Sequence, residues 1–159
     1  MDLTKVPYSI ILYREVNVIK TYGGFLISQI KQLQGRVFEK MLKESGVDAF
    51  NGAQGRILYT LWEHKRLTIT EISRLTSLAK TSLTSMLDRM EEIGLIERTP
   101  DKQNRRQIFV SITEKAISYR DAYDRVSEQM NKLFYQGFTE KEITDFEDTL
   151  RKIIVNLEN

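Results

Sequence analysis

Hydrophobic residues recur along most of the chain with the spacing of one face of an α-helix, and its two prolines lie outside these periodic stretches. Three helix starts carry the capping-box pattern, in which a polar residue is followed three positions later by Gln or Glu. They are Asn51 with Gln54, Thr68 with Glu71 and Thr139 with Glu142. The pattern predicts helices over 25–44, 80–93, 114–136 and 140–157, with shorter ones beginning after Asn51 and Thr68.

Two strands are predicted after the helix over 80–93, where Gly94 is a natural helix stop. Hydrophobic and polar residues alternate over 106–112, residues 95–99 form the preceding strand, and the turn between them begins at Pro100. Residues 68–113 therefore read helix, turn, helix, strand, turn, strand. This order predicts a helix-turn-helix followed by a β-hairpin wing. The fold class we expect is mainly α with a small β-hairpin wing (α+β).

The helix over 80–93 has two different faces. One arc is apolar and must face the core: Leu83, Met86, Leu87, Met90 and Ile93. The other side starts with small polar and basic residues, which can approach DNA phosphates and base edges. The candidate DNA contacts on it are Lys80, Thr81, Ser82, Thr84, Ser85 and Arg89. The alternative interpretation is an ordinary solvated helix face.

The turn between the predicted strands is basic. Arginines on a protruding loop can enter a narrow minor groove, where the negative potential is enhanced. The alternative is an exposed polar turn in which one arginine pairs with Asp101. The candidate DNA contacts of this wing are Lys102, Gln103, Asn104, Arg105 and Arg106.

Long apolar stripes flank this central region. The final helix carries a wide stripe that includes Ile143, Phe146, Leu150 and Ile154. We expect three segments within one structural domain: dimerisation residues 1–50, DNA-binding residues 51–113 and dimerisation residues 114–159. Because periodicity cannot separate burial within one chain from burial between chains, a bundle packed within one subunit is the alternative to a homodimer.

The amino-acid composition excludes several classes of function. The chain has 159 residues with 24 basic and 22 acidic side chains, so DNA binding would depend on local clusters of charge. The absence of cysteine excludes thiol sensing, and the single histidine, His64, cannot build a zinc site with nitrogen and sulfur ligands. All-carboxylate metal binding stays open. No signal peptide, membrane span or catalytic arrangement is apparent, so we expect a cytoplasmic non-enzyme without cofactor or metal.

Several short motifs, taken in order, resemble the MarR family (multiple antibiotic resistance regulator) of transcription factors. They are Glu71-Ile72-Ser73, Lys80-Thr81-Ser82-Leu83-Thr84, Leu87-Asp88-Arg89-Met90-Glu91, Gly94-Leu95-Ile96-Glu97-Arg98, Asn104-Arg105-Arg106 and Ser111-Ile112-Thr113-Glu114-Lys115. The resemblance implies a homodimer whose terminal helices interlock and whose winged helices bind a palindromic operator. It also implies repression, and release of DNA when a small phenolic or anionic molecule binds between the dimerisation and DNA-binding parts.

Three positions depart from the family pattern. Asn104 stands where an Asp usually braces the wing arginines, and Ser77 replaces a common turn glycine. Ala79 stands where a Ser often caps the recognition helix, so Ser77 or Thr81 would have to cap it instead.

The sequence thus predicts a sequence-specific regulator of transcription that binds double-stranded DNA. The alternative is a winged-helix module for protein–protein interaction, which should carry aromatic or large apolar anchors on the exposed face of 80–93, and that face has none. An effector is expected to be small and aromatic or anionic. Trp62, Phe25, Tyr22 and His64 could line its pocket, although core packing is favoured for Trp62 and Phe25.

Overall fold

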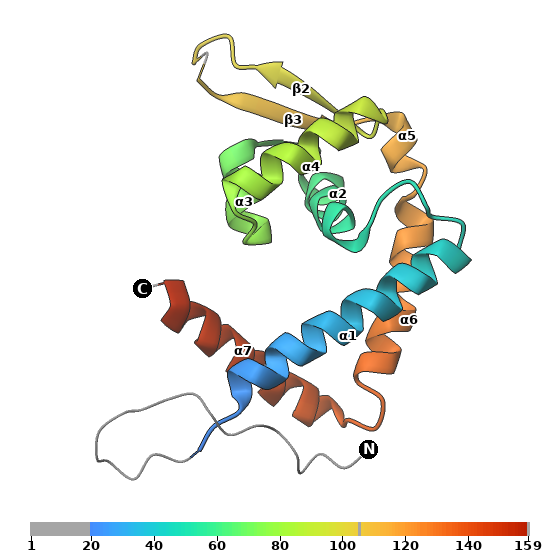
Figure 1. Ribbon diagram of the computed structural model, residues 1–159, viewed down its shortest axis with the longest axis vertical. Helices are drawn as coiled ribbons and strands as arrows, with labels where there is room; N and C mark the ends of the chain where they lie inside the picture. Colours follow the sequence, from blue (N-terminus) through green and yellow to red (C-terminus); the bar gives the residue numbers. More distant parts are fainter. Residues whose placement is uncertain (1–19, 105, 159) are drawn as a thin grey trace.

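The computed structural model describes residues 20–104 and 106–158, and it is mainly helical with one small antiparallel sheet, as predicted (Figure 1). The strands lie in the order β1-β3-β2. The elements are α1 (Gly23–Glu44), α2 (Gly52–His64), β1 (Arg66–Thr68), α3 (Ile69–Thr76), α4 (Lys80–Glu92), β2 (Ile96–Pro100), β3 (Ile108–Ile112), α5 (Glu114–Ile117), α6 (Arg120–Phe134) and α7 (Glu140–Glu158).

The core lies between α2, α3, α4 and the sheet. Leu61 of α2, Leu83 and Leu87 of α4 and Val110 of β3 are fully buried in one cluster. The apolar arc predicted for α4 is confirmed, because Met90 is buried as well and the two remaining members are partly buried against the cluster. Burial of leucine-sized side chains stabilises the fold by about 1.5–3 kcal/mol each. This packing fixes the orientation of α4.

All three predicted capping boxes are present, at Asn51, Thr68 and Thr139. The Asn51 side chain accepts a hydrogen bond from Gln54 N (2.9 Å), and Gln54 Oε1 accepts one from Asn51 N (3.1 Å). Thr68 and Glu71 make the same reciprocal pair. The hydrogen bonds from Thr68 lower the pKa of Glu71. Each box satisfies N–H groups that the first turn of a helix leaves without partners.

The strand β1 was not predicted. It pairs antiparallel with β3, with Leu67 opposite Val110. The guanidinium of Arg66 lies 3.9 Å from the centre of the Phe109 ring, a cation–π contact across the two strands. A strand of three residues is too short to show alternation, so its pairing depends on the tertiary fold.

The prediction of one helix over 114–136 is wrong, because a break after Ile117 separates α5 from α6. At this break Tyr119 N donates to Ala116 O (3.2 Å), and the Tyr119 ring packs edge-on against Phe50. The indole Nε1 of Trp62 also donates to Ala116 O (3.2 Å). Trp62 is buried, which confirms its predicted core role. These contacts with α2 and with the loop before it are not visible in the periodicity of 114–136.

The helices outside the winged helix extend away from it (Figure 1). α6 leads from the winged-helix end to the far end of the molecule, and α1 packs along it. α2 approaches α6 closely at Gly55, where a Cβ atom would lie 2.6 Å from the Tyr123 ring. At Gly137 the chain adopts a φ of +87°, which favours glycine, and turns from α6 into α7.

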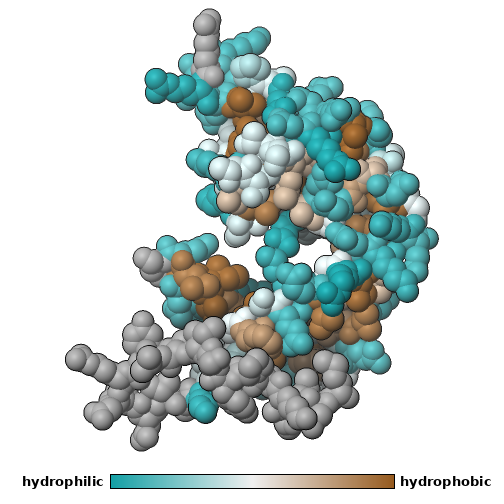
Figure 2. All heavy atoms as spheres, in the orientation of Figure 1, coloured by the Kyte–Doolittle hydropathy of each residue, from teal (hydrophilic) through white to brown (hydrophobic). Residues whose placement is uncertain are grey.

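Apolar surface gathers on α7 and on the helices beside it (Figure 2). None of the residues of α7 is buried, and Leu157 is 81% exposed. On α1, Phe25 is 53% exposed, so its predicted core packing is wrong for a single chain. In the part of the chain that the structure describes, no helix has the length and apolar character needed to cross a membrane.

Arg98 joins the wing to α4. From strand β2 its guanidinium donates to Glu91 Oε2 through Nε (2.9 Å) and Nη2 (2.6 Å), and its backbone N donates to Glu91 Oε1 (2.9 Å). Its Nη1 lies 2.7 Å from Asp88 Oδ1. The Arg98 side chain is 23% exposed, so this network is only partly screened by solvent. The side-chain and backbone hydrogen bonds from Arg98 hold the pKa of Glu91 below its ordinary value.

We expect Arg98→Gln to destabilise the fold at neutral pH by roughly 1 kcal/mol. Because folding lowers the pKa of Glu91, its contribution is complete above the ordinary value of 4.5 and is lost as pH falls through the folded pKa. Urea unfolding between pH 7 and pH 3 should therefore show a shallower acid loss in the variant than in the wild type. Arg125→Gln, on the exposed face of α6, is the control. Parallel wild-type and Arg98→Gln profiles would contradict the linkage.

Candidate nucleic-acid interface

The outward face of α4 is small, polar and basic at its N-terminal end. Because Leu83 and Leu87 are fully buried, they fix the rotation of the helix about its axis. The residues that this rotation exposes include five of the predicted DNA contacts: Lys80, Thr81, Ser82, Thr84 and Ser85. The structure therefore brings these five together on one surface.

α4 begins without a side-chain cap. Its N-cap is Ala79, which makes no capping hydrogen bond, so the prediction that Ser77 or Thr81 caps the helix is wrong. Ser77 instead ends α3 in the left-handed conformation, with a φ of +54°, and Thr81 lies inside α4. The first-turn N–H groups of α4 are thus left to solvent, and with the helix dipole they favour an anion such as phosphate.

Side chains of α3 hold the turn that positions α4. Ser73 Oγ donates to Leu78 O (2.7 Å), and Thr76 Oγ1 donates to Ile72 O (2.6 Å). These bonds restrain a turn in which a serine, not a glycine, adopts positive φ. The strain of that conformation is about 1 kcal/mol for a residue with a Cβ atom.

The wing tip is held by its own backbone and side chains. Asn104 Oδ1 accepts from Arg106 N (3.2 Å), and Asp101 Oδ1 accepts from Gln103 N (2.9 Å). Asn104 thus organises the turn through a backbone N–H, where the family pattern uses a carboxylate and an arginine. Arg105 lies outside the described residues. The other four predicted wing residues are exposed: Lys102, Gln103, Asn104 and Arg106.

Two of the three acidic residues of α4 are paired with an arginine of β2. Asp88 and Glu91 both pair with Arg98, which offsets their negative charge close to the surface that carries the hydroxyls. The wing and α4 lie at the same end of the molecule, away from α1 and α7 (Figure 1). Sequence reasoning missed the role of Arg98, because a pair between a helix and a strand gives no local spacing signal.

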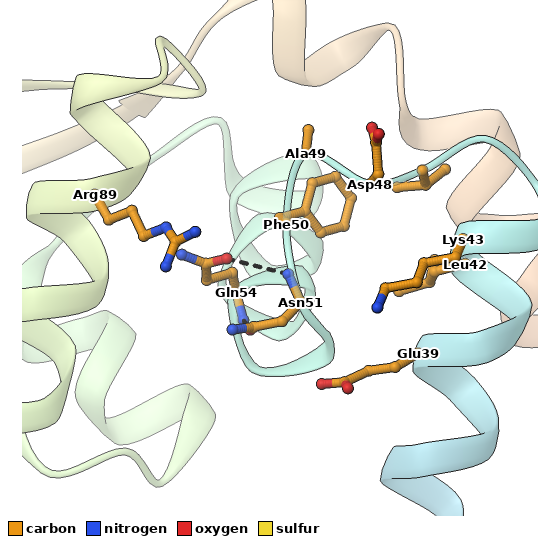
Figure 3. Close-up of a pocket in the computed structure, with 10 residues that line it drawn as sticks. Glu39, Leu42, Lys43, Asp48, Ala49, Phe50, Asn51, Gln54 and Arg89 are labelled. Carbon is orange, nitrogen blue, oxygen red and sulfur yellow. Dashed lines mark hydrogen bonds between the residues drawn. The ribbon is translucent and has the colours of Figure 1, made fainter.

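Arg89, the sixth predicted contact on α4, is also exposed. Its side chain lines a cavity of about 170 Å³ with Glu39 and Lys43 of α1 and Gln54 of α2. Figure 3 shows the guanidinium extending from α4 towards Gln54. The DNA contact of Arg89 stays a prediction.

A larger cavity, which sequence reasoning did not identify, lies between α1, α2 and α6. Its volume is about 400 Å³, and its lining includes Lys31, Phe38, Arg56, Tyr59 and Tyr123. Burial raises the pKa of Tyr123 to about 12, so its phenol is neutral at pH 7. None of the four predicted pocket residues lines this cavity or the smaller one. The lining comes from three separate helices, which explains why no single sequence pattern marks it.

Comparisons with known proteins agree with this geometry. Residues 50–108 match the model of the MarR family. The transcriptional repressor IacR of Pseudomonas putida is 27% identical over 120 residues, which are 76% of this chain and 70% of IacR. A mutant MarR of Escherichia coli, complexed with operator DNA, is 25% identical with a TM-score of 0.73, covering 82% of this chain and 91% of MarR.

A second DNA complex is similar. Reduced AbfR of Staphylococcus epidermidis, bound to DNA, is 26% identical with a TM-score of 0.69, covering 86% of this chain and 92% of AbfR. The family match spans α2 to the start of β3, which includes α4 and the wing. From this match and these likenesses, we conclude that the chain belongs to the MarR family of winged-helix, DNA-binding transcriptional regulators.

Proposed function

We propose that the protein is a homodimeric repressor that binds a palindromic operator, with α4 in the major groove and the wing in the adjacent minor groove. The observation that supports this most is the exposed hydroxyl and N–H surface at the start of α4. The basic wing lies at the same end of the molecule (Figure 1). Repression is inferred from the name of the similar IacR.

Charge supports DNA as the partner over a protein. The chain carries a net charge of only +2, so attraction to phosphate must come from local basic groups, which include the exposed Lys80, Lys102 and Arg106. Exposed phosphate contacts of this kind position a protein on DNA. The exposed arc of α4 offers no aromatic or large apolar anchor, which disfavours the alternative of a protein-interaction module.

The homodimer is proposed from α7. Its first half packs on α6, where the Phe146 and Phe134 rings lie 6.4 Å apart. In its second half, Ile154 is 53% and Leu157 is 81% exposed. The start of α1 is similarly apolar and exposed, at Phe25 and Leu26. A second copy of the chain would bury both faces, and it would place two winged helices on one operator.

A small effector is proposed for the cavity between α1, α2 and α6. Phe38, Tyr59 and Tyr123 supply aromatic walls, and Lys31 and Arg56 supply two positive charges against one negative charge from Glu39. This lining suits a small aromatic carboxylate. Such a ligand would lower DNA affinity only if it bound more tightly to the arrangement that does not bind DNA.

Selection from a random DNA pool should give a palindrome. On that operator, Arg106→Ala should weaken binding about tenfold and reduce the slope of log affinity against log salt by roughly one for each lost phosphate contact. Fluorescence anisotropy at several salt concentrations measures both. Arg125→Ala, which removes the same charge from α6, should change neither. No preference for any sequence over random DNA would refute the proposed function, and unchanged binding in Arg106→Ala would remove the wing from it.

Adding charge to the exposed end of α7 should separate the subunits. We expect the wild type to sediment at twice the chain mass of 18.6 kDa. The double substitution Ile154→Glu and Leu157→Glu should give monomers, because buried carboxylates without partners are costly. Thr144→Glu, on the exposed polar face of α7, should remain dimeric. A doubly substituted protein that sediments as a dimer would exclude this face from the interface.

Benzoate is a suitable probe of the larger cavity. At millimolar concentration it should raise the melting temperature of the free protein and lower its affinity for the selected operator. Arg56→Gln removes one of the two cations that line the cavity and should weaken both responses strongly, whereas Arg125→Gln should keep them. A response that survives undiminished in Arg56→Gln would place the site elsewhere, and no response in the wild type would exclude an aromatic carboxylate of this size.

A further inference from the structure

Two hydroxyl groups on α4 already donate their protons to hydrogen bonds within the helix. Thr84 Oγ1 donates its proton to Lys80 O (2.9 Å), and Ser85 Oγ donates its proton to Ser82 O (3.0 Å). A hydroxyl has one proton and two lone pairs. While these bonds within the helix persist, Thr84 and Ser85 present only acceptors to an outside group.

Thr84, which is exposed, also carries a methyl group beside its hydroxyl. The residue lies on the exposed side of α4, one helical turn after Lys80. In the major groove an A·T pair presents the N6 amino donor of adenine and the 5-methyl group of thymine. A C·G pair also presents an amino donor, but it has no methyl group. The acceptor and methyl of Thr84 therefore match an A·T pair better than any other.

The side chains that usually recognise guanine are scarce on α4. Its only basic residues are Lys80, at the tip, and Arg89, and Arg89 extends towards Gln54 (Figure 3). Asp88 could accept from the amino group of cytosine, but it pairs with Arg98 at 2.7 Å. Charged side chains that would favour a G·C pair are therefore not available at the middle of the exposed arc. Asp88 is paired, Arg89 extends towards α2, and Lys80 lies at the start of the helix.

From this arrangement we propose that Thr84 makes α4 select an A·T base pair in each half of the operator. The Thr84 hydroxyl accepts a hydrogen bond from the N6 amino group of adenine, and its methyl packs against the thymine methyl. Ser85 supplies a second acceptor beside it. The inference rests on the proposed binding of operator DNA by α4.

The test uses the operator selected from random DNA, with single bases replaced by analogues. Deoxyuridine removes the thymine methyl, purine deoxyriboside removes the adenine amino group, and 7-deazaguanine removes the N7 acceptor of guanine. The full-length wild type is compared with Thr84→Ser, which keeps the hydroxyl, and Thr84→Val, which keeps the methyl shape. Anisotropy titrations at one salt concentration give the affinity of each pair of protein and DNA.

We expect one A·T position in each half-site at which deoxyuridine weakens wild-type binding about fourfold, the effect of losing one buried methyl contact. Thr84→Ser should lose this sensitivity to deoxyuridine. Thr84→Val should keep it, but it should become insensitive to the loss of the adenine amino group at that position. In the wild type that loss should weaken binding about fivefold.

Thr144 provides a matched control. Its Oγ1 also donates to the carbonyl four residues earlier, Glu140 O (3.0 Å), on an exposed face of α7. Thr144→Ser and Thr144→Val should respond to every base analogue as the wild type does. Because Thr84 is exposed, both Thr84 variants should unfold within about 0.5 kcal/mol of the wild type.

The outcomes separate this inference from the proposed function. Binding without any sequence preference would refute the proposed function itself. Sequence-specific binding that is insensitive to deoxyuridine and to the missing amino group would overturn only the role of Thr84. The role of Thr84 would also be overturned if, among the bases beneath α4, 7-deazaguanine caused the largest loss of wild-type affinity. Sensitivity that changes in the Thr84 variants as described supports the inference.

Discussion

The burial of one arc of α4 is the constraint on which the candidate DNA surface depends. Leu83 and Leu87 are fully enclosed by the core, so α4 cannot turn about its axis without exposing them. Successive residues of a helix are rotated by about 100° about its axis. Turning α4 by one such step would bring leucines to the surface in place of hydroxyl-bearing residues. The cost of exposing each leucine is about 1.5–3 kcal/mol. The core thus determines which side chains α4 presents on the candidate DNA surface.

The second constraint is electrostatic. A chain with 24 basic and 22 acidic residues has little overall attraction for DNA, so the placement of individual charges decides where DNA can bind. Arg98 pairs with two of the three carboxylates of α4, Asp88 and Glu91. The same residue therefore fixes the wing to α4 and offsets the charge that would repel phosphate. A regulator of this kind gains a local positive surface without a strongly basic composition.

Local signals made much of the winged helix predictable. The capping boxes at Asn51 and Thr68 and the apolar period of α4 involve residues within a few positions of one another, and all of them are confirmed. The features that were not predicted depend on contacts between residues far apart in the sequence. β1 exists because β3 pairs with it, and the α5–α6 break is held by contacts of Ala116 and Tyr119 with Trp62 and Phe50. The wing of the candidate site was expected from its basic residues, but its connection to α4 through Arg98 was not.

α2 is the element through which the proposed effector cavity can influence DNA binding. One side of α2 contributes Leu58 and Leu61 to the core cluster that also contains Leu83 and Leu87 of α4, and another side lines the larger cavity with Arg56 and Tyr59. At Gly55 the helix approaches the Tyr123 ring so closely that no side chain fits between them. Tightly packed elements of this kind do not deform gradually, since small shifts in close contact lose packing energy quickly. A ligand in the cavity would therefore have to move α2 and α6 together, and α4 would follow through the shared core.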